Sequence, residues 1–347
     1  MLAPLCGLRK ALVVATMVAA CAPAAREEAA PASLVERARV SMGSELRLTA
    51  WTADEANAVA AFEHVFEDFE YLDRLLSVWH PDSDISRLNA AAGQEPVRVN
   101  AITIDILQTA RSVSEQTGGK FDATFGALSG LWKFDHDQDD SIPSRDEVSR
   151  RLPFVDYRDL EIDAAAGTAR LRRAGMRAHL GGIGKGYAVD RAAAMLRSHR
   201  IADFMIQAGG DLYVGGQRGD RSWRGAIKDP RADRIFAALD LKDETLSTSG
   251  DYERFFIREG RRYHHILDPS TGEPARGSRS VTIVTGRAVM ADALSTGVFV
   301  LGPEAGMRLI EQLPDVEGVI VDADNRVLIS AGLRSRVEVV AHPSEAP

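Results

Sequence analysis

The chain has 347 residues, of which 45% are hydrophobic, 27% are charged and 6% are aromatic. This is the composition of a globular protein with one or two domains, which excludes a disordered chain, a collagen-like repeat and a disulfide-stapled miniprotein. The 42 Lys and Arg residues against 50 Asp and Glu give a formal net charge of −8, with no concentrated basic stretch, so nucleic acid is not an expected partner.

The N-terminus has the pattern of a secretory signal. Arg9 and Lys10 precede an apolar run over residues 11–20, and Cys21 follows directly. Residues 18–21, Val-Ala-Ala-Cys, resemble a bacterial lipobox, so we expect a signal peptide over residues 1–20 and a lipid on Cys21. The alternative is a transmembrane anchor, but the run is shorter than the roughly 20 residues that a bilayer requires. The protein is therefore expected on the periplasmic side of the bacterial inner membrane, held by a lipid anchor.

Residues 21–33 are expected to form a tether between the lipid and a single domain over residues 34–340. Residues 22–32 contain six alanines, two prolines and three charges, a composition typical of a linker. Cys6 and Cys21 are the only cysteines in the sequence, so the domain can hold neither a disulfide nor a thiolate metal site.

Apolar spacing predicts the first long helix of the domain. Ala58, Phe62, Val65, Phe69, Leu72 and Leu76 are separated alternately by four and three residues. Thr52 and Glu55 have the spacing of a capping box at the start of this helix. Two more helices are expected over residues 103–116 and 187–197.

Short strands dominate the second half of the chain. The expected strands are residues 204–207, 212–214, 235–241, 255–257, 280–284 and 318–321. A helix over residues 289–301 ends at Gly302, and Pro303 begins another. Helices followed by runs of strands indicate an α+β fold.

The first candidate functional segment is a glycine-rich loop that leads into a helix. Residues 179–190 read His-Leu-Gly-Gly-Ile-Gly-Lys-Gly-Tyr-Ala-Val-Asp. Glycines at a helix N-terminus let backbone N–H groups approach an anion closely. The alternative is an ordinary tight turn, and the spacing fits neither a Walker loop nor a Rossmann fingerprint.

The second candidate segment contains two adjacent histidines. His264 and His265 precede a predicted turn over residues 268–272, and a polar run, residues 247–252, lies earlier in the chain. Successive strand residues point to opposite faces, so only one of the two histidines can point into a given site. The alternative is a structural histidine that is satisfied by its neighbours.

The third candidate segment lies in the last long helix. Asp292 and Thr296 are four residues apart, so they share one helix face, with Ser295 beside them. Oxygen ligands of this kind suit Mg²⁺. The alternative is a buried polar patch that bonds to the backbone.

Together these segments resemble the ApbE family of FAD:protein FMN transferases. The matching pieces follow the family order between about residues 40 and 302. They are residues 42–43, 79–89, 121–124, 131–134, 179–190, 208–211, 248–252, 265–269 and 291–296.

The resemblance implies a bilobal α+β transferase with mixed or antiparallel sheets flanked by helices. Such an enzyme binds FAD and a divalent metal, and it moves FMN onto a threonine or serine of an acceptor protein, with AMP as the leaving group. The expected cofactor is Mg²⁺, and the expected partners are FAD, an acceptor flavoprotein and the membrane. Two alternatives remain, a periplasmic lipoprotein that only binds FAD and a metal-dependent FAD pyrophosphatase.

The resemblance also implies the roles of single residues. His265 is the expected catalytic histidine, and the expected metal ligands are Asp292, Ser295, Thr296 and a backbone oxygen of Gly182. The residues expected to contact FAD are Met42, Trp79, Trp132, Lys133, Phe134, His179, Lys185 and the backbone near Ile266. The hydroxyls of residues 247–249 are expected to bond to substrate or backbone.

The chain departs from the family pattern at two positions. His179 stands where many relatives have an acidic or small polar residue, which replaces an obligate acceptor by a group that can donate. Gly184 stands where alanine is common, and this change should be harmless.

Overall fold

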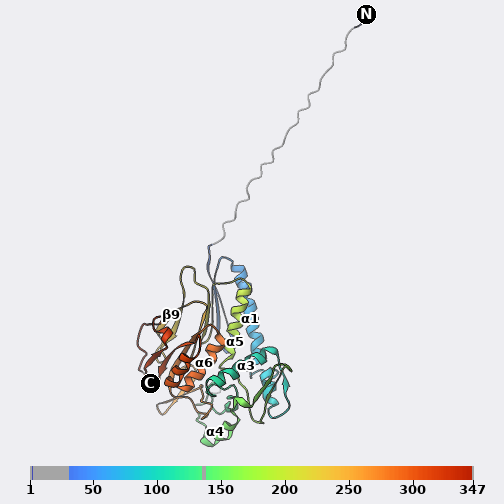
Figure 1. Ribbon diagram of the computed structural model, residues 1–347, viewed down its shortest axis with the longest axis vertical. Helices are drawn as coiled ribbons and strands as arrows, with labels where there is room; N and C mark the ends of the chain where they lie inside the picture. Colours follow the sequence, from blue (N-terminus) through green and yellow to red (C-terminus); the bar gives the residue numbers. More distant parts are fainter. Residues whose placement is uncertain (1, 3–30, 135–137, 346–347) are drawn as a thin grey trace. The chain divides into compact units, whose positions relative to one another are not determined.

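The computed structural model describes residues 2, 31–134 and 138–345, and its largest element is an eight-stranded antiparallel sheet (Figure 1). The strand order is β1-β2-β6-β7-β10-β13-β14-β15. The strands are β1 Ser33–Ser41, β2 Ser44–Thr52, β6 Phe204–Ala208, β7 Asp211–Gly215, β10 Glu244–Gly250, β13 Ser278–Thr285, β14 Glu317–Asp322 and β15 Val327–Ile329. The predicted signal peptide, Cys21 and most of the tether lie outside the described residues.

Three smaller antiparallel sheets complete the β structure of the described ranges. One has the order β16-β9-β8, another β3-β5-β4, and β11 pairs with β12. Their strands are β8 Trp223–Lys228, β9 Ile235–Leu241, β16 Glu338–Val339, β3 Val97–Arg98, β4 Leu160–Asp163, β5 Thr168–Leu171, β11 Phe255–Arg258 and β12 Arg261–His264.

The helices of the described chain gather mainly on one face of the large sheet. They are α1 Glu55–Leu76, α2 Asp84–Ala90, α3 Ala101–Gln116, α4 Arg145–Arg151, α5 Gly184–Ser198, α6 Ala288–Leu301 and α7 Pro303–Gln312. Helices α1 and α5 lie side by side, and α5 also contacts α6 (Figure 1). Among the described residues, none of these helices has the length and apolar run that a membrane span needs.

Strand periodicity divides the core into two layers. On β13, Val281 and Ile283 face the helices, whereas Val284 points to the opposite face and packs with Trp223 and Phe236 of the small sheet. The large sheet is thus covered by helices on one face and by the β8-β9-β16 sheet on the other. Because both faces are covered, β13 and β14 carry buried apolar residues on both sides, whereas β10 is mostly polar.

Helix α1 begins differently from the prediction. Its N-cap is Asp54, whose side chain accepts a hydrogen bond from the backbone N–H of Asn57. Thr52 instead accepts a hydrogen bond from the backbone N–H of Asp54 through its Oγ1. The predicted capping box of Thr52 and Glu55 is therefore wrong by two residues, because an aspartate closer to the helix takes the cap.

The predicted α+β class is confirmed by this arrangement, and the predicted helices and strands occur with shifts of at most three residues at their ends. The strands that the sequence prediction omitted include β1, β2, β8 and β10. Hydrogen bonds hold the segment after residue 340 against the domain. Ser344 donates its N–H to Asp229 Oδ2 at 2.9 Å, and Pro343 accepts from Asn325.

Candidate functional site

The start of helix α5 is where the first predicted residues meet. Met42 lies in the tight turn between β1 and β2, and its Cε is 3.7 Å from the position that a Cβ on Gly184 would occupy. This is an ordinary van der Waals distance, so alanine would fit at residue 184, as the sequence prediction expects. The β1-β2 turn and the glycine-rich loop therefore lie next to each other.

Two aspartates, Asp292, which is buried, and Asp190, which is half-buried, tie α5 to α6 in a reciprocal way. Asp292 of α6 accepts a hydrogen bond from the backbone N–H of Gly186 through its Oδ2 at 2.9 Å. Asp190 of α5 accepts from the backbone N–H groups of Ala288 and Val289 at 2.7 and 3.0 Å, at the start of α6. A Cβ on Gly186 would lie 2.3 Å from the carbonyl oxygen of Ala288, so only glycine permits this approach.

Asp190 is a functional residue that the sequence pattern does not reveal. It is the last residue of the glycine-rich segment, and its carboxylate satisfies N–H groups that the first turn of a helix leaves without partners. Burial raises its pKa, and the two backbone hydrogen bonds oppose that shift.

A chain of hydroxyl hydrogen bonds orients the predicted metal ligands. Ser295 Oγ donates to the carbonyl oxygen of Asp292 at 2.8 Å, and Ser249 Oγ lies 2.8 Å from Ser295 Oγ and 3.1 Å from Thr296 Oγ1. Each hydroxyl has one proton. Ser249 therefore donates to Ser295, and Thr296 donates to Ser249. Both α6 hydroxyls then keep lone pairs for a further ligand.

The oxygen set around Thr296 fits a hard cation. The position of a Cβ on Gly182 is 3.3 Å from Thr296 Oγ1, so the backbone of Gly182 adjoins the hydroxyl chain. Asp292 is 5% exposed and supplies the negative charge that a buried Mg²⁺ needs. Within the described ranges no three His, Cys, Asp or Glu side chains form a metal cluster, so any cation here depends on hydroxyl and carbonyl oxygens as well.

Lys185 adds a positive charge beside this oxygen set. Its Nζ is 3.7 Å from Asp211 Oδ2, and Asp211 Oδ1 accepts a short hydrogen bond from Ser247 Oγ. The negative charges of Asp292 and Asp211 raise the pKa of Lys185, so it stays an ammonium. Burial, together with Asp292, raises the pKa of Asp211 to about 7, and Lys185 opposes that rise.

The predicted contact of the β10 hydroxyls with substrate stays a prediction, and the hydrogen bonds that they make in the protein go to side chains in place of the backbone. In the structure they bond to side chains, Ser247 to Asp211 and Ser249 to the α6 hydroxyls, while Thr248 Oγ1 lies 2.8 Å from Thr282 Oγ1. Side chains alternate along a strand, so Ser247 and Ser249 point to one face of the sheet and Thr248 points to the other, which explains their different partners.

The adjacent histidines have different surroundings. His264 is 4% exposed, donates from Nε2 to the carbonyl oxygen of Ala275 at 2.7 Å and accepts from the N–H of Ile266 at 3.3 Å. His265 is half-buried, and its Nδ1 is 3.4 Å from the carbonyl oxygen of Arg254. A proton on Nδ1 leaves Nε2 of His265 as an acceptor. Burial, with the positive charge of Arg254, lowers the pKa of His265 to about 3, so the ring is neutral at pH 7.

The predicted aromatic contacts pack chiefly with one another. The rings of Trp132 and Phe134 are stacked at 6.0 Å between centroids, and they form a buried cluster with Phe256 and Tyr263. Trp132 Nε1 donates to the carbonyl oxygen of Gly272 at 2.8 Å, which links this cluster to the turn after His265.

The other predicted flavin contacts are distributed around the molecule. Trp79 lies on the loop between α1 and α2 with 70% of its surface exposed. Lys133 forms an ion pair with Asp139. Ile266 uses its N–H toward His264 and its carbonyl oxygen toward the N–H of Ala275. Their contact with FAD stays a prediction.

His179 is oriented by the glycine-rich loop itself. Its Nδ1 accepts a hydrogen bond from the backbone N–H of Gly181 at 2.9 Å, and its ring lies 5.2 Å from that of Phe125. Because Nδ1 accepts, the proton of the neutral ring is on Nε2, so this side chain can donate to a ligand. An acidic residue at this position would only accept.

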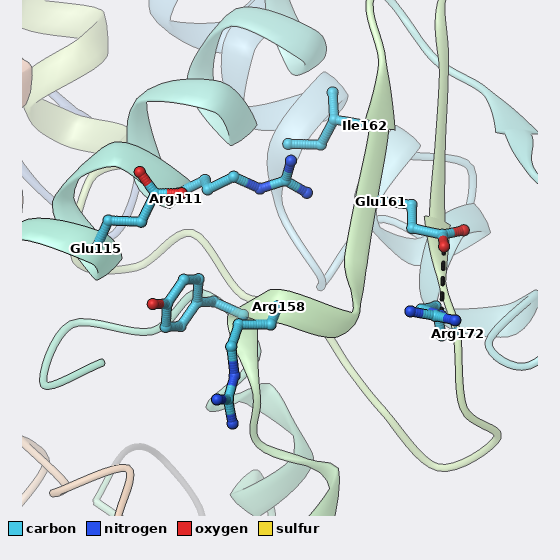
Figure 2. A pocket seen from close by; sticks show the side chains of 7 residues that line it. Arg111, Glu115, Arg158, Glu161, Ile162 and Arg172 are labelled. Atoms are coloured by element: carbon cyan, nitrogen blue, oxygen red, sulfur yellow. Dashed lines mark ion pairs between the residues drawn. The ribbon is translucent and has the colours of Figure 1, made fainter. Parts of the chain in front are cut away.

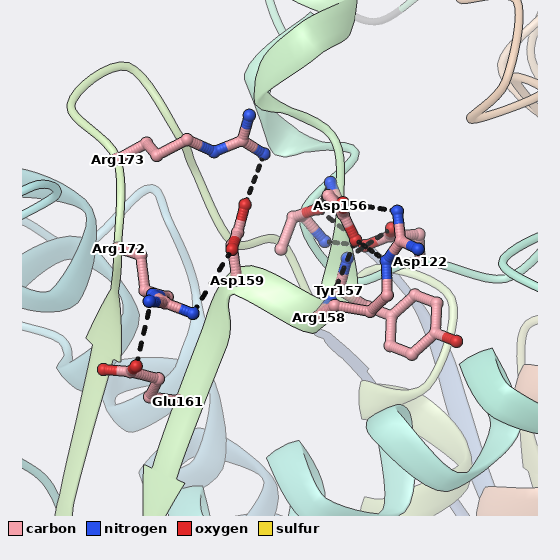
Figure 3. Close-up of polar contacts among 9 residues, drawn as sticks. Asp122, Asp156, Tyr157, Arg158, Asp159, Glu161, Arg172 and Arg173 are labelled. Carbon is pink, nitrogen blue, oxygen red and sulfur yellow. Dashed lines mark hydrogen bonds and ion pairs between the residues drawn. The ribbon is translucent and has the colours of Figure 1, made fainter.

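A hollow of about 380 Å³ lies elsewhere, at the edge of the β3-β5-β4 sheet (Figure 2). Its lining includes Arg111, Arg158 and Arg172 but none of the predicted site residues. Carboxylates neutralise two of these arginines, as Figure 3 shows for the pairs Arg158–Asp156 and Arg172–Glu161, while Arg111 donates to the carbonyl oxygen of Leu160. We therefore place the candidate site at the α5-α6 junction.

The large antiparallel sheet and this junction define an α+β protein with a site suited to a cation and an anionic ligand together. The family model described as the ApbE family matches residues 42–320. The chain therefore belongs to the ApbE family.

Several relatives cover most of this chain. A protein of Treponema pallidum named FAD:protein FMN transferase is 36% identical over 322 residues, covering 88% of this chain and 89% of the relative. A protein of Klebsiella pneumoniae with the same name is 30% identical over 300 residues, covering 86% and 92%.

Solved structures agree with the fold. An ApbE protein of Thermotoga maritima has 32% identity and a TM-score of 0.81, covering 90% of this chain and 100% of its own. The flavin transferase ApbE from Vibrio cholerae has 27% identity and a TM-score of 0.80, covering 88% and 100%.

Proposed function

We propose that this protein transfers FMN from FAD to a threonine or serine hydroxyl of an acceptor protein and releases AMP. The observation that carries the proposal is the meeting of Lys185, Gly182, Asp292, Ser295 and Thr296 at the start of α5. A positive side chain and an oxygen set for a cation are what an attack on a diphosphate requires. The family membership and the names of the relatives support the same reaction.

Mg²⁺ is the proposed cofactor. It would be held by Asp292, by the hydroxyls of Ser295 and Thr296 and by the backbone oxygen of Gly182. When bound, it supplies charge neutralisation of the diphosphate and so helps AMP to leave. The hydrogen bonds around Ser249 support this assignment. The protons of both α6 hydroxyls are used within the protein, so lone pairs of both oxygens remain for a metal.

His265 is the proposed general base. A neutral ring whose Nδ1 proton is directed to Arg254 presents Nε2 as an acceptor for the hydroxyl proton of the acceptor protein. His264 uses both ring nitrogens within the protein, which leaves it no acceptor for substrate.

The expected effects of histidine substitutions follow from this division. His265→Asn should lower transfer by about 10²- to 10⁴-fold, the usual contribution of general-base catalysis, while FAD binding remains. His264→Ala should instead lower stability, because it removes two buried hydrogen bonds. Equal losses of transfer from both variants, together with lost FAD binding, would contradict the proposed division.

The protein is proposed to act at the periplasmic face of the inner membrane, attached through a lipid on Cys21. The basic residues, the apolar run and the cysteine in the first 21 residues support this proposal, together with the alanine- and proline-rich segment that follows.

One experiment separates transfer from the two alternatives. The full chain is incubated with FAD, Mg²⁺ and a candidate acceptor, and the acceptor mass, AMP and free FMN are measured. Transfer predicts an acceptor that is heavier by one FMN minus one water, and an equal amount of AMP. Free FMN with an unmodified acceptor would indicate a pyrophosphatase, and bound FAD without either product would indicate a binding protein.

A further inference from the structure

The turn between β6 and β7 encloses the side chain of Lys185. Gly209 has a φ of +59°, and a Cβ at this position would lie 3.6 Å from Lys185 Cε. A Cβ on Gly210 would lie 2.8 Å from the carbonyl oxygen of Thr248, so the turn is also pressed against β10. The backbone of residues 208–211 therefore lies close along the Lys185 side chain. The last of these residues, Asp211, carries a carboxylate.

That carboxylate belongs to Asp211, which is 2% exposed. Ser247 holds one of its oxygens, Oδ1, through a short hydrogen bond. The other oxygen, Oδ2, is buried and accepts no hydrogen bond from the described residues, although it lies 3.7 Å from Lys185 Nζ. A buried carboxylate oxygen without a hydrogen bond destabilises the fold, so this arrangement is not explained by stability.

The distance and the exposure of the lysine indicate what the arrangement does. A separation of 3.7 Å is longer than a hydrogen bond, so Asp211 attracts the ammonium without saturating its three N–H donors. The Lys185 side chain is 26% exposed, so its donors can still reach a ligand. The attraction limits the positions of a flexible side chain, and it keeps the charge that a diphosphate requires.

We propose that Asp211, oriented by Ser247, is a positioning residue that holds the Lys185 ammonium in place for the diphosphate of FAD. The inference rests on the proposed function. Lys185 touches the substrate, and Asp211 acts only through Lys185. Without Asp211 the lysine would keep only the attraction of Asp292, so the substrate would have to order more of the side chain, and that ordering would reduce the affinity for FAD.

A double-mutant cycle in the full chain, purified in detergent, tests this role. The variants are Asp211→Asn, Lys185→Gln and the double variant, with Asp243→Asn as a control on an exposed aspartate that pairs with Arg197. For each, the dissociation constant of FAD in Mg²⁺, kcat, KM and the thermal unfolding midpoint are measured. Asp211→Asn keeps the shape of the side chain and an oxygen for Ser247.

The expected result is non-additive. Asp211→Asn should weaken FAD binding about tenfold, the upper end of what ordering one flexible side chain costs on binding. In the Lys185→Gln background the same substitution should change FAD affinity by no more than about twofold, since its target is gone. Ser247→Ala should weaken FAD binding less than Asp211→Asn and should likewise have no effect without Lys185.

Four results would overturn the proposal. Multiplicative losses in the double variant would mean that Asp211 acts independently of Lys185. Unchanged FAD affinity in Asp211→Asn would mean that the lysine needs no positioning. If Asp211→Asn does not fold, then Ser247→Ala decides in its place, and an unchanged FAD affinity in that variant refutes the role.

The wild-type chain distinguishes this proposal from the proposed function. A wild-type chain that binds FAD but transfers nothing refutes the proposed function, and the binding measurements of the double-mutant cycle can still be interpreted. A wild-type chain that binds no FAD refutes both.

Discussion

Asp292 has two separable roles, a hydrogen bond to Gly186 and a negative charge for the metal, and one pair of substitutions distinguishes them. Its Oδ2 accepts the N–H of Gly186 at 2.9 Å, and its charge is the only formal negative charge among the proposed metal ligands. Asp292→Asn retains an amide oxygen for Gly186 but removes the charge, whereas Asp292→Ala removes both. The two variants are therefore matched controls for each other.

The magnitudes follow from burial. A buried N–H left without a partner costs about 1–3 kcal/mol, so Asp292→Ala should lower the free energy of unfolding by about 2 kcal/mol. Asp292→Asn should lower it much less. Both variants should lose Mg²⁺-dependent transfer, because uncharged ligands hold the metal weakly.

The assay is transfer at increasing Mg²⁺, together with urea unfolding of each variant. If the wild type is fully active in excess chelator, the metal assignment is wrong. If Asp292→Asn transfers FMN at the wild-type rate, the charge of Asp292 is not needed. If Asp292→Ala is as stable as the wild type, the hydrogen bond to Gly186 contributes nothing.

Other expected outcomes concern single residues. Thr296→Ala should reduce Mg²⁺ affinity less than either Asp292 variant, as measured by the Mg²⁺ dependence of transfer. Trp79→Ala should weaken FAD binding about ten- to a hundredfold if its exposed indole stacks on the ligand, and an unchanged titration would exclude stacking. Cys21→Ser should release the protein from the membrane or leave it unprocessed, as fractionation and mass measurement would show. Between about pH 3 and 6.5 the folded chain binds fewer protons at His265 than the unfolded chain, so stability falls as pH drops through this window, and His265→Asn should flatten that slope in melting experiments.

The regular elements of the fold could be predicted because their patterns are local. The spacing of four and three residues along α1 and the glycine and proline at residues 302 and 303 determine helices from neighbours in sequence. Strand β10 could not be found in this way. Its residues Ser247 and Ser249 are polar because they face the α5-α6 junction, and Thr248 on the other face is polar as well, so the period of two that marks a half-buried strand is absent.

The identity of the α6 residues in the site was likewise accessible, because Asp292 and Thr296 share a helix face by spacing alone. Their partners were not. Ser249 reaches Ser295 and Thr296 from a strand more than 40 positions earlier, and Asp211 reaches Ser247 through the pairing of β7 with β10. Such contacts depend on sheet register, which a single sequence does not specify.

The contact of Asp292 with α5 and the contact of Lys185 with Asp211 have one physical origin. Gly186 lets α5 approach α6 so closely that a Cβ would collide with a carbonyl oxygen, and this approach brings the first turn of α5 to the carboxylate of Asp292. The same first turn carries Lys185, which the β6-β7 turn then encloses against Asp211. A glycine-rich segment is therefore needed here to bring charged groups from separate elements together, as well as to leave backbone N–H groups open to an anion. Substituting Gly186 by alanine would separate α5 from α6 and displace Lys185 and Asp292 together, so the cationic and the anionic halves of the site depend on a single backbone contact.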